Sequence, residues 1–421
     1  MKVLQINSTY KNGGSTGRIA YDLSLIMQNN KIENNVAYGI ELGEGRFSNA
    51  ICLQTRLELR ISQLKSRIFA KHGFYNVSAT RRLIKYIEEL KPDIIHLHNI
   101  HGFYIHVGIL FDYIKTHNIP IVWTLHDCWS FTGWCAYFDY SGCDRWKNYC
   151  YCCPSKKDYP KAWITARSTQ NFKLKKKTFS GVRNLILITP SQWLANLTRY
   201  SFLKNYDVKV INNGVDINVF KPCGNDYKEK IGIKGKKMIL AVAGGLAKRK
   251  GKDYLLKIPY LLNNDEILVI LGINKDQIKL LPPNNCIGVP YTNAIHELAQ
   301  IYSAADIFIN TTLEDNFPTT NIEAMACGTP VVTFNTGGSC ESVLDEEMVR
   351  IDNDIKITKV GGVVPKGDLN KMLYLIRYFL SKGKSVYVES CVEKVKMKYN
   401  KEYQYQIYLE LYKDIITKNC C

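Results

Sequence analysis

The chain has 421 residues, more than one typical domain core, so we expect two domains. Hydrophobic residues make up 46% and charged residues 22% of the chain, a balance that excludes a disordered protein. The formal net charge of +18 indicates an anionic partner: nucleic acid, an anionic membrane surface or a phosphorylated substrate. We expect no nucleic acid, because no zinc-finger, RNA-binding or basic-zipper pattern is present.

The sequence predicts a cytoplasmic protein. No apolar run reaches the roughly 18 residues that suggest a membrane-spanning helix. The start, MKVLQINSTY, has too short an apolar stretch for a secretory signal. In that compartment the 14 cysteines are expected to be thiols or metal ligands rather than disulfides.

Strand and helix patterns alternate along the first half. Strands are expected at 2–7, 92–98, 119–127 and 184–191, and helices at 18–27, 79–91 and 192–203. A glycine-bearing loop, 8–17, follows the first strand. This alternation is typical of parallel sheets covered by helices on both faces.

A cluster of Asn, Gly, Pro and Asp at 210–225 predicts a linker, after which the alternation resumes. Strands are expected at 236–243, 266–273, 306–312 and 330–335, and helices at 252–262 and 295–305. We therefore expect an α/β protein with two Rossmann-like, doubly wound domains facing a central cleft. The predicted domains are 1–211 and 212–400, followed by a closing helix over 401–421.

A cationic loop follows the first strand of the second domain. In GGLAKRKGKD the glycines allow close approach, and Lys248, Arg249 and Lys250 supply positive charge. The loop is similar to a phosphate cradle but fails the P-loop pattern, because Asp253 stands where Ser or Thr is needed. A solvated surface turn is the alternative.

Two carboxylates, Asp315 and Glu323, lie around a predicted helix start at Pro318. The helix begins at the carboxyl edge of the sheet, where carboxylates can accept hydrogen bonds from sugar hydroxyls, as an acidic residue does for ribose in Rossmann folds. The alternative is that they complement the helix dipole, which fits Asp315 better than Glu323.

These stretches resemble the donor-site signature of the GT-B glycosyltransferases of family 4, also called group 1. The matching segments are EDNFPTTNIEAMACGTPVV, the following Gly-Gly with Glu341, VINNGVDINVFKP and KGKDYLL. The resemblance implies a GT-B fold that binds a UDP- or GDP-sugar in the C-terminal domain and requires no metal for catalysis.

The resemblance also implies roles for single residues. Glu323 would hold the donor ribose, Asp315 would lie near the donor sugar as a catalytic residue, and Lys250 would meet the diphosphate. Two positions depart from the family: Asp315 stands where Glu is usual, with Glu314 as an alternative register, and Gly244 and Gly245 stand where Arg is usual. Lys248 and Arg249 are candidates to compensate for that arginine.

In the first domain, His126 and Asp127 emerge at the carboxyl end of a predicted strand and are the catalytic candidates. A histidine there can donate to an oxygen or take a proton near neutral pH. His98 and His101 are weaker candidates. The resemblance adds Gly13 and Gly14, in the loop after the first strand, near the donor phosphate and the acceptor. It further implies a retaining reaction without a covalent protein nucleophile.

A cysteine-rich insert is expected over 128–154. Cys135, Cys143, Cys150 and Cys153 could form a structural zinc site that pins a long loop, and reduced buried thiols are the alternative. The insert resembles one found in a subset of bacterial exopolysaccharide transferases, which implies a structural role near the acceptor.

Two basic helices are expected, over 56–71 and 172–179. In the first, Leu57, Ile61, Leu64 and Ile68 form one stripe among cationic side chains. Such helices can dock on anionic lipid, or they can face the core with solvated charges. The net charge favours peripheral contact with the inner face of the plasma membrane.

We therefore predict an enzyme, a hexosyltransferase-type glycosyltransferase (EC 2.4). It would move a sugar from a nucleotide-sugar to a lipid-linked or oligosaccharide acceptor in surface polysaccharide or exopolysaccharide synthesis. The alternatives are a GT-B transferase with a soluble acceptor, of sucrose- or trehalose-synthase type, and a catalytically silent sugar-nucleotide-binding protein.

Overall fold

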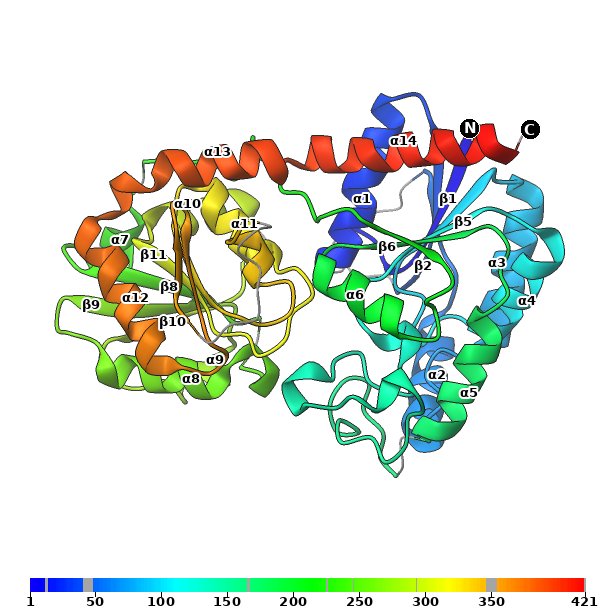
Figure 1. Ribbon diagram of the computed structural model, residues 1–421, viewed down its shortest axis with the longest axis horizontal. Coiled ribbons are helices and arrows are strands. Elements are labelled where there is room, and N and C mark those ends of the chain that lie inside the picture. The colour runs from blue at the N-terminus through cyan, green and yellow to red at the C-terminus, as the bar shows by residue number, and fades with distance from the viewer. Residues whose placement is uncertain are drawn as a thin grey trace. The chain divides into compact units, whose positions relative to one another are not determined.

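The computed structural model describes residues 1–11, 14–40, 48–164, 167–224, 226–244, 246–292, 294–345 and 354–419. It divides into two compact units, one comprising Met1–Asn212 with Tyr405–Cys421 and the other comprising Asn213–Gln404. The predicted closing helix, α14 (Lys401–Asn419), thus belongs for most of its length to the first unit. Each unit is an α/β sandwich with helices on both faces of its own sheet (Figure 1).

The first unit is built on a parallel sheet, seven-stranded in its described part. In sheet order the strands are β3 (Ala50–Cys52), β2 (Glu33–Ile40), β1 (Lys2–Thr9), β4 (Ile94–Leu97), β5 (Ile121–Thr124), β6 (Leu185–Thr189) and β7 (Asp207–Val210). The central strands are buried on both faces, as expected for a parallel sheet of apolar and β-branched residues.

The side chains of successive residues in these strands pack into two separate hydrophobic cores, one on each face of the sheet, because side chains alternate between the faces. Val3, Ile94 and Val122 pack with α1 (Gly14–Asn29) and α14. Leu4, Ile95 and Trp123 pack with the helices of the other face. Those helices are α3 (Val77–Leu90), α4 (Val107–His117), α5 (Ser168–Phe179) and α6 (Gln192–Tyr200). The remaining helix is α2 (Arg56–Phe69).

The second unit contains a seven-stranded sheet in its described part, parallel except for β13. In sheet order the strands are β10 (Cys286–Val289), β9 (Glu266–Leu271), β8 (Lys237–Val242), β11 (Ile307–Asn310), β12 (Val331–Phe334), β14 (Gly361–Val364) and β13 (Lys356–Thr358). Its α-helices are α7 (Tyr227–Lys230), α8 (Lys252–Lys257), α9 (Lys275–Ile278), α10 (Ile295–Ala304), α11 (Thr319–Ala326), α12 (Leu369–Lys382) and α13 (Val388–Lys398). Helices with apolar faces pack on this sheet to form one continuous core.

The predicted linker pairs through its backbone with Tyr399 and with Lys401, the first residue of α14. Val215 donates from its backbone nitrogen to Tyr399 O at 2.8 Å and accepts from Lys401 N at 3.0 Å. A Cβ on Gly214 would lie 2.3 Å from the Lys401 Cα, so only glycine fits at this crossing. Asp216 forms an ion pair with Lys401 at 2.8 Å.

No helix in the described part of the chain combines the length and the apolar character that a membrane span requires.

Candidate functional site

The cationic loop of the second unit lies where the strand order of its sheet reverses. β8 and β11 are neighbours in the sheet, but the chain visits β9 and β10 on one side before it crosses to β11 on the other. In open α/β sheets, ligands bind at such a switch point, beyond the carboxyl ends of the strands. The 3-10 turn η4 (Lys248–Lys250) follows β8, and residues 311–318 follow β11.

Gly251 allows these two loops to touch through their backbones. A Cβ at this position would lie 2.0 Å from the carbonyl oxygen of Thr311, and φ is +80°. Leu313 donates from its backbone nitrogen to Arg249 O at 2.8 Å. The Arg249 guanidinium donates in return to Glu314 O at 2.5 Å. The cationic turn is therefore fixed against the end of β11, which disfavours the solvated-turn alternative.

Opposite charges face each other at this edge. The Lys250 ammonium forms an ion pair with the Asp315 carboxylate, whose side chain is 15% exposed. Burial acts to raise the pKa of Asp315, but the positive charges of Lys250 and Arg249 outweigh it, so the pKa lies below its ordinary value. Asp315 is ionised at neutral pH. The alternative carboxylate, Glu314, has a fully buried side chain, so Asp315 is the better placed of the two.

Glu323 is held by a buried hydroxyl. It lies on α11, which begins directly after Pro318, and it is half-buried. Its Oε2 accepts a hydrogen bond of 2.9 Å from the hydroxyl of Tyr302, a fully buried residue of α10. A carboxylate oriented in this way can accept hydrogen bonds from neighbouring sugar hydroxyls, because each of its oxygens has two acceptor positions.

A glycine loop after β12 supports the backbone of Asp315, a structural role that was not predicted from the sequence. Gly337 has a φ of +55°, and a Cβ there would lie 2.0 Å from the Asp315 carbonyl oxygen. Gly338 donates from its backbone nitrogen to the same oxygen at 3.0 Å. The sequence contained a signal for this loop, because the glycine pair lies two and three residues after the predicted strand 330–335, and Gly244 likewise follows the predicted strand 236–243.

The remaining residues that were predicted to bind the donor also follow the carboxyl ends of strands, in one or the other unit. Lys248 opens η4 and is exposed, and Gly244, also exposed, has a φ of +51°. In the first unit, Gly14 opens α1 after β1 and is exposed. Gly13 and Gly245 lie outside the described residues.

In the first unit, His126 follows β5 and belongs to a chain of hydrogen bonds. Its Nε2 lies 3.1 Å from Nδ1 of His98, and His98 Nε2 lies 2.9 Å from Oε1 of Gln5. Burial lowers the pKa of His126 to about 4 and that of His98 well below its ordinary value. Both imidazoles are therefore neutral at pH 7, and each carries a single N–H.

Gln5 fixes the direction of this chain. Its Nε2 donates to the carbonyl oxygen of Ala20 at 3.1 Å, so its Oε1 must face His98. His98 then carries its proton on Nε2 and accepts on Nδ1. His126 consequently carries its proton on Nε2, and its Nδ1 holds a lone pair. In this tautomer His126 can accept a hydrogen bond from a hydroxyl through Nδ1.

Asp127 has a different environment from its neighbour. It is buried, and its Oδ2 lies 2.8 Å from Nε2 of His101 while its Oδ1 accepts from Trp129 N at 2.9 Å. Burial acts to raise the pKa of Asp127, but the charge and hydrogen bond of His101 outweigh it and lower the pKa. Both carboxylate oxygens are engaged within the unit, so the geometry favours a positioning role for Asp127.

Two family models match the chain. The model for Glycosyltransferase Family 4 matches residues 52–219, and the model for Glycosyl transferases group 1 matches residues 225–385. Together they cover more than half of the chain. The chain belongs to the family 4, group 1 glycosyltransferases.

The relatives of this glycosyltransferase agree with that assignment. A putative colanic acid biosynthesis glycosyl transferase, WcaC of Escherichia coli K12, is 25% identical over 83% of this chain and 89% of its own length. Sucrose-phosphate synthase from Thermosynechococcus elongatus shares the fold, with a TM-score of 0.71 at 16% identity over 99% of this chain and 100% of that one. HepE of Anabaena, solved with UDP-glucose, has a TM-score of 0.65 at 16% identity over 98% and 100%. The GT-B fold is thereby confirmed, and the protein is a transferase enzyme.

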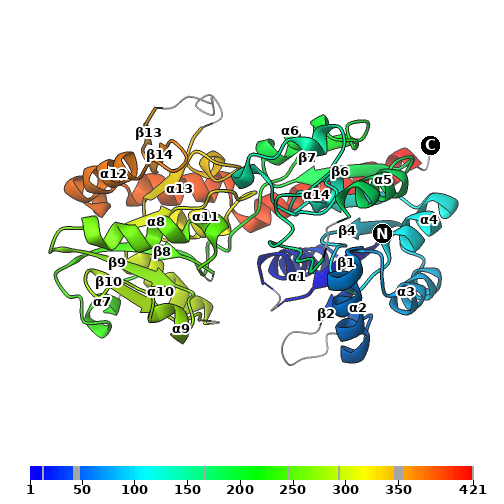
Figure 2. The same cartoon turned by 90° about the horizontal axis from the view of Figure 1, so that it is seen from below.

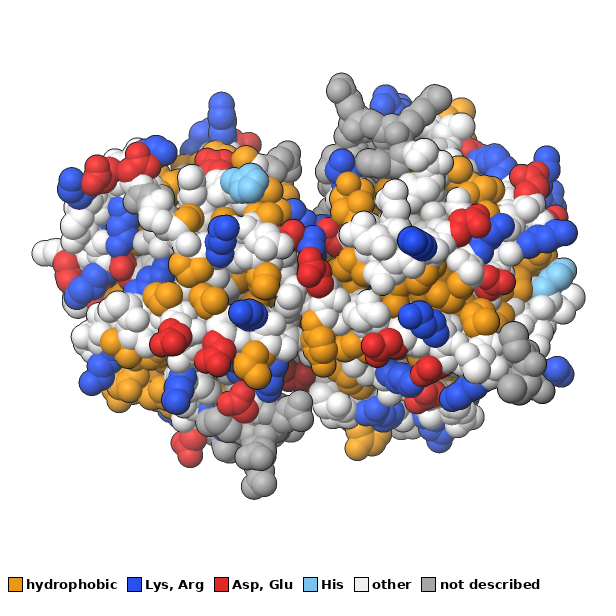
Figure 3. All heavy atoms as spheres, turned by 90° about the horizontal axis from the view of Figure 1, so that it is seen from above, with side chains coloured by type: hydrophobic (Ala, Val, Ile, Leu, Met, Phe, Trp, Pro, Cys, Tyr) orange, Lys and Arg blue, Asp and Glu red, His pale blue; other side chains and the backbone are white. Residues whose placement is uncertain are grey.

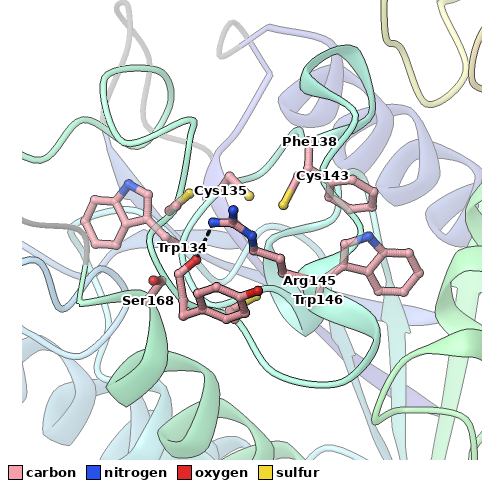
Figure 4. A pocket seen from close by; sticks show the side chains of 10 residues that line it. Trp134, Cys135, Phe138, Cys143, Arg145, Trp146 and Ser168 are labelled. Carbon is pink, nitrogen blue, oxygen red and sulfur yellow. Dashed lines mark hydrogen bonds between the residues drawn. The ribbon is translucent and has the colours of Figure 1, made fainter.

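The cysteine-rich insert of the glycosyltransferase surrounds a small pocket of the first unit. The insert lies between β5 and α5, and the lining includes all four predicted ligands: Cys135, Cys143, Cys150 and Cys153. Figure 4 shows the Cys135 and Cys143 thiols and the Arg145 guanidinium near the middle of this pocket. Arg145 donates to the carbonyl oxygen of Tyr151 at 2.9 Å.

As they lie, these side chains do not form a metal site. Among the described residues, no three His, Cys, Asp or Glu side chains are placed to hold a metal ion. Cys150 Sγ accepts a hydrogen bond from Gly133 N at 3.2 Å, and the free thiols of Cys135 and Cys153 are hydrogen-bonded to each other. Arg145 brings positive charge into the pocket. Structural zinc stays a prediction, and no step of the function proposed below depends on it.

Proposed function

We propose that this glycosyltransferase moves a sugar from a nucleoside diphosphate sugar to a lipid-linked acceptor in polysaccharide synthesis, with retention of configuration. The observation that carries the proposal is the pairing of the cationic turn with Asp315 at the switch point of the second sheet. One side of this site is suited to phosphate oxygens and the other to sugar hydroxyls.

The residues of the second unit have distinct roles in this proposal. Lys248, Arg249 and Lys250 stabilise the charge that develops on the departing diphosphate, so the leaving group needs no metal ion. Asp315 and Glu323 accept hydrogen bonds from the sugar and the ribose, and thereby orient the donor. UDP-glucose bound to HepE, a protein of the same fold, supports a nucleotide-sugar as the donor.

In the first unit, the Nδ1 lone pair of His126 accepts a hydrogen bond from a reacting or neighbouring hydroxyl. With a pKa of about 4, His126 is a weak base and orients that hydroxyl more effectively than it removes its proton. The similarity to WcaC, a putative colanic acid biosynthesis glycosyl transferase, supports an acceptor that is a growing polysaccharide.

The test is nucleotide release from a panel of UDP- and GDP-sugars, with and without a lipid-linked acceptor. We expect one donor to be consumed only when the lipid-linked acceptor is present, and Lys250→Ala to lower kcat/KM at least 100-fold. The matched control is Lys237→Ala. Lys237 forms a similar ion pair with Asp265, at 2.9 Å, at the amino end of β8 in the same sheet.

Equal loss of activity in the Lys250 and Lys237 variants would contradict the proposed role of the cationic turn. Transfer to a soluble sugar alone would favour an acceptor of the sucrose type. Nucleotide binding without turnover of any donor would favour a silent binding protein.

A further inference from the structure

Helix α2 has its apolar side chains on the outside. Its buried residues are Ser62 and Ser66, whereas Leu57 is 68%, Ile61 44% and Leu64 49% exposed. An ordinary surface helix shows the opposite pattern, with its apolar stripe toward the core. The helix is well formed, because Thr55 and Glu58 make a capping box at its start. The core-facing alternative is therefore wrong for this segment.

The apolar surface continues beyond the helix. Phe69, the last residue of α2, is 49% exposed, and Trp163 and Ile164, which lie between the insert and α5, are 60% and 68% exposed. Trp163 donates from its backbone nitrogen to Arg67 O at 2.9 Å, which holds it beside the end of α2. We call these six residues the α2 surface: Leu57, Ile61, Leu64, Phe69, Trp163 and Ile164. Figures 1 and 2 both draw α2 at the periphery of the first unit.

Positive charge accompanies this surface. The exposed cations on and next to α2 are Arg56, Arg60, Lys65, Arg67 and Lys71. The carboxylate on the helix, Glu58, is paired with Arg82 at 2.7 Å. Elsewhere the charges are mixed: on the face drawn in Figure 3, Lys and Arg side chains are interspersed with Asp and Glu among the coloured residues. The α2 surface thus combines exposed apolar side chains with one sign of charge.

We propose that the α2 surface docks on an anionic phospholipid bilayer. Exposed Leu, Ile, Phe and Trp side chains fit the boundary between headgroups and acyl chains, and Arg and Lys fit anionic headgroups. A second copy of the chain is a poorer occupant, because docking α2 on α2 would bring two sets of cations together. The functional reason for such docking rests on the proposed function, in which the acceptor is lipid-linked. Binding of the chain to vesicles can nevertheless be measured without any sugar transfer.

The experiment is co-sedimentation of the full chain with vesicles of phosphatidylcholine, with or without one quarter phosphatidylglycerol. We expect binding to the anionic vesicles that weakens at least tenfold in high salt, since headgroup attraction is screened. The triple variant Leu57→Gln, Ile61→Gln, Leu64→Gln should bind at least tenfold more weakly. The matched control replaces three exposed apolar residues of the second unit with Gln: Tyr260, Leu280 and Tyr291.

A second measurement follows Trp163 directly. Four of the other tryptophans are at most 2% exposed, so the fluorescence change on vesicle addition should come mainly from Trp163. We expect a blue shift that Trp163→Phe removes while folding is unchanged. Equal binding of the triple variant and its control would overturn the proposal. The proposal would also be overturned if light scattering showed that the native chain is a dimer and the triple variant a monomer. That result would assign the α2 surface to contact with a second copy of the chain. Vesicle binding without transfer would contradict only the proposed function.

Discussion

The tautomer of His126 is determined through its partner His98 by the orientation of Gln5. The chain from Ala20 through Gln5 and His98 has one direction, because a backbone carbonyl can only accept. A histidine nitrogen with a lone pair can accept a hydrogen bond from a hydroxyl. A nitrogen that carries a proton can instead donate to an oxygen that has no proton, such as a carbonyl or phosphate oxygen. Gln5 and His98 are therefore positioning residues for the proposed reaction.

Replacing Gln5 with Met should reverse the tautomer. Without an acceptor at Nε2, His98 is free to carry its proton on Nδ1 and donate it to His126, which would then be protonated on Nδ1. Nitrogen-15 NMR of histidine-labelled protein distinguishes the two tautomers, and His126→Asn identifies the signal. Gln5→Glu keeps an acceptor and should keep the native tautomer. If the Met variant folds and its His126 signal matches that of the native protein, the inferred direction of the chain is wrong.

At the scale of elements, the two basic helices show what sequence could and could not predict. Both α2 and α5 combine apolar and cationic residues, and the sequence left their orientation open. The structure buries Phe172 and Phe179 of α5 together with Lys175, which donates to Trp129 O at 2.6 Å and lies 3.7 Å from the centre of the Trp129 ring. Orientation depends on partners distant in the sequence, such as the insert, and local periodicity does not contain them.

The edge of the second sheet that carries the cationic turn and Asp315 was more predictable. Glycines and cations directly after a strand, and carboxylates around a helix start, are local patterns whose position in a parallel sheet follows from the alternation of elements. The ion pair between Lys250 and Asp315 and the bond from Tyr302 to Glu323 were not predictable, because they join different loops and helices. The same limit applies to Gln5, His98 and His126, which come from three different strands or strand ends.

The cysteine-rich insert gives a prediction at this scale. Four thiols line one pocket but do not converge on one point as they lie, so the predicted zinc site requires their side chains to turn toward a common centre. Since thiolates are preferred ligands of zinc, the zinc prediction then requires about one zinc ion per chain in protein purified without chelator. Removal of the metal should lower the thermal stability of the first unit, and Cys143→Ser should reduce the zinc content. The control is Cys286→Ser, at a partly buried cysteine of the second unit. A zinc content near zero would leave the cysteines as reduced packing groups.

At the scale of the whole molecule, the last helix is tied into the first unit by buried polar groups. The Tyr412 hydroxyl is hydrogen-bonded to Nδ1 of His96, with 2.6 Å between the two atoms. His96 Nε2 lies 2.8 Å from the hydroxyl of Thr124, which in turn lies 3.1 Å from the hydroxyl of Tyr408. The end of the chain therefore contributes to the core built by its beginning, in agreement with the division into units.

This arrangement predicts how the stability of the first unit depends on pH. Burial lowers the pKa of His96 to about 3, whereas an unfolded histidine titrates near 6.5. Between these values the unfolded chain binds a proton that the folded chain does not, so stability is complete above about pH 6.5 and is lost as pH falls toward 3. At pH 5 the loss from this residue is about 2 kcal/mol.

All six tryptophans lie in the first unit, so their fluorescence during urea unfolding reports that unit alone. We expect His96→Gln to reduce the difference in unfolding free energy between pH 7 and pH 5 by about 2 kcal/mol. The control is His117→Gln, at an exposed position near the end of α4, which should leave that difference unchanged. His126 also has a lowered pKa, about 4, so the His96 variant should keep part of the pH dependence. An unchanged pH dependence in a folded His96 variant would show that the buried histidine and its tyrosine partners do not determine the acid sensitivity of the unit.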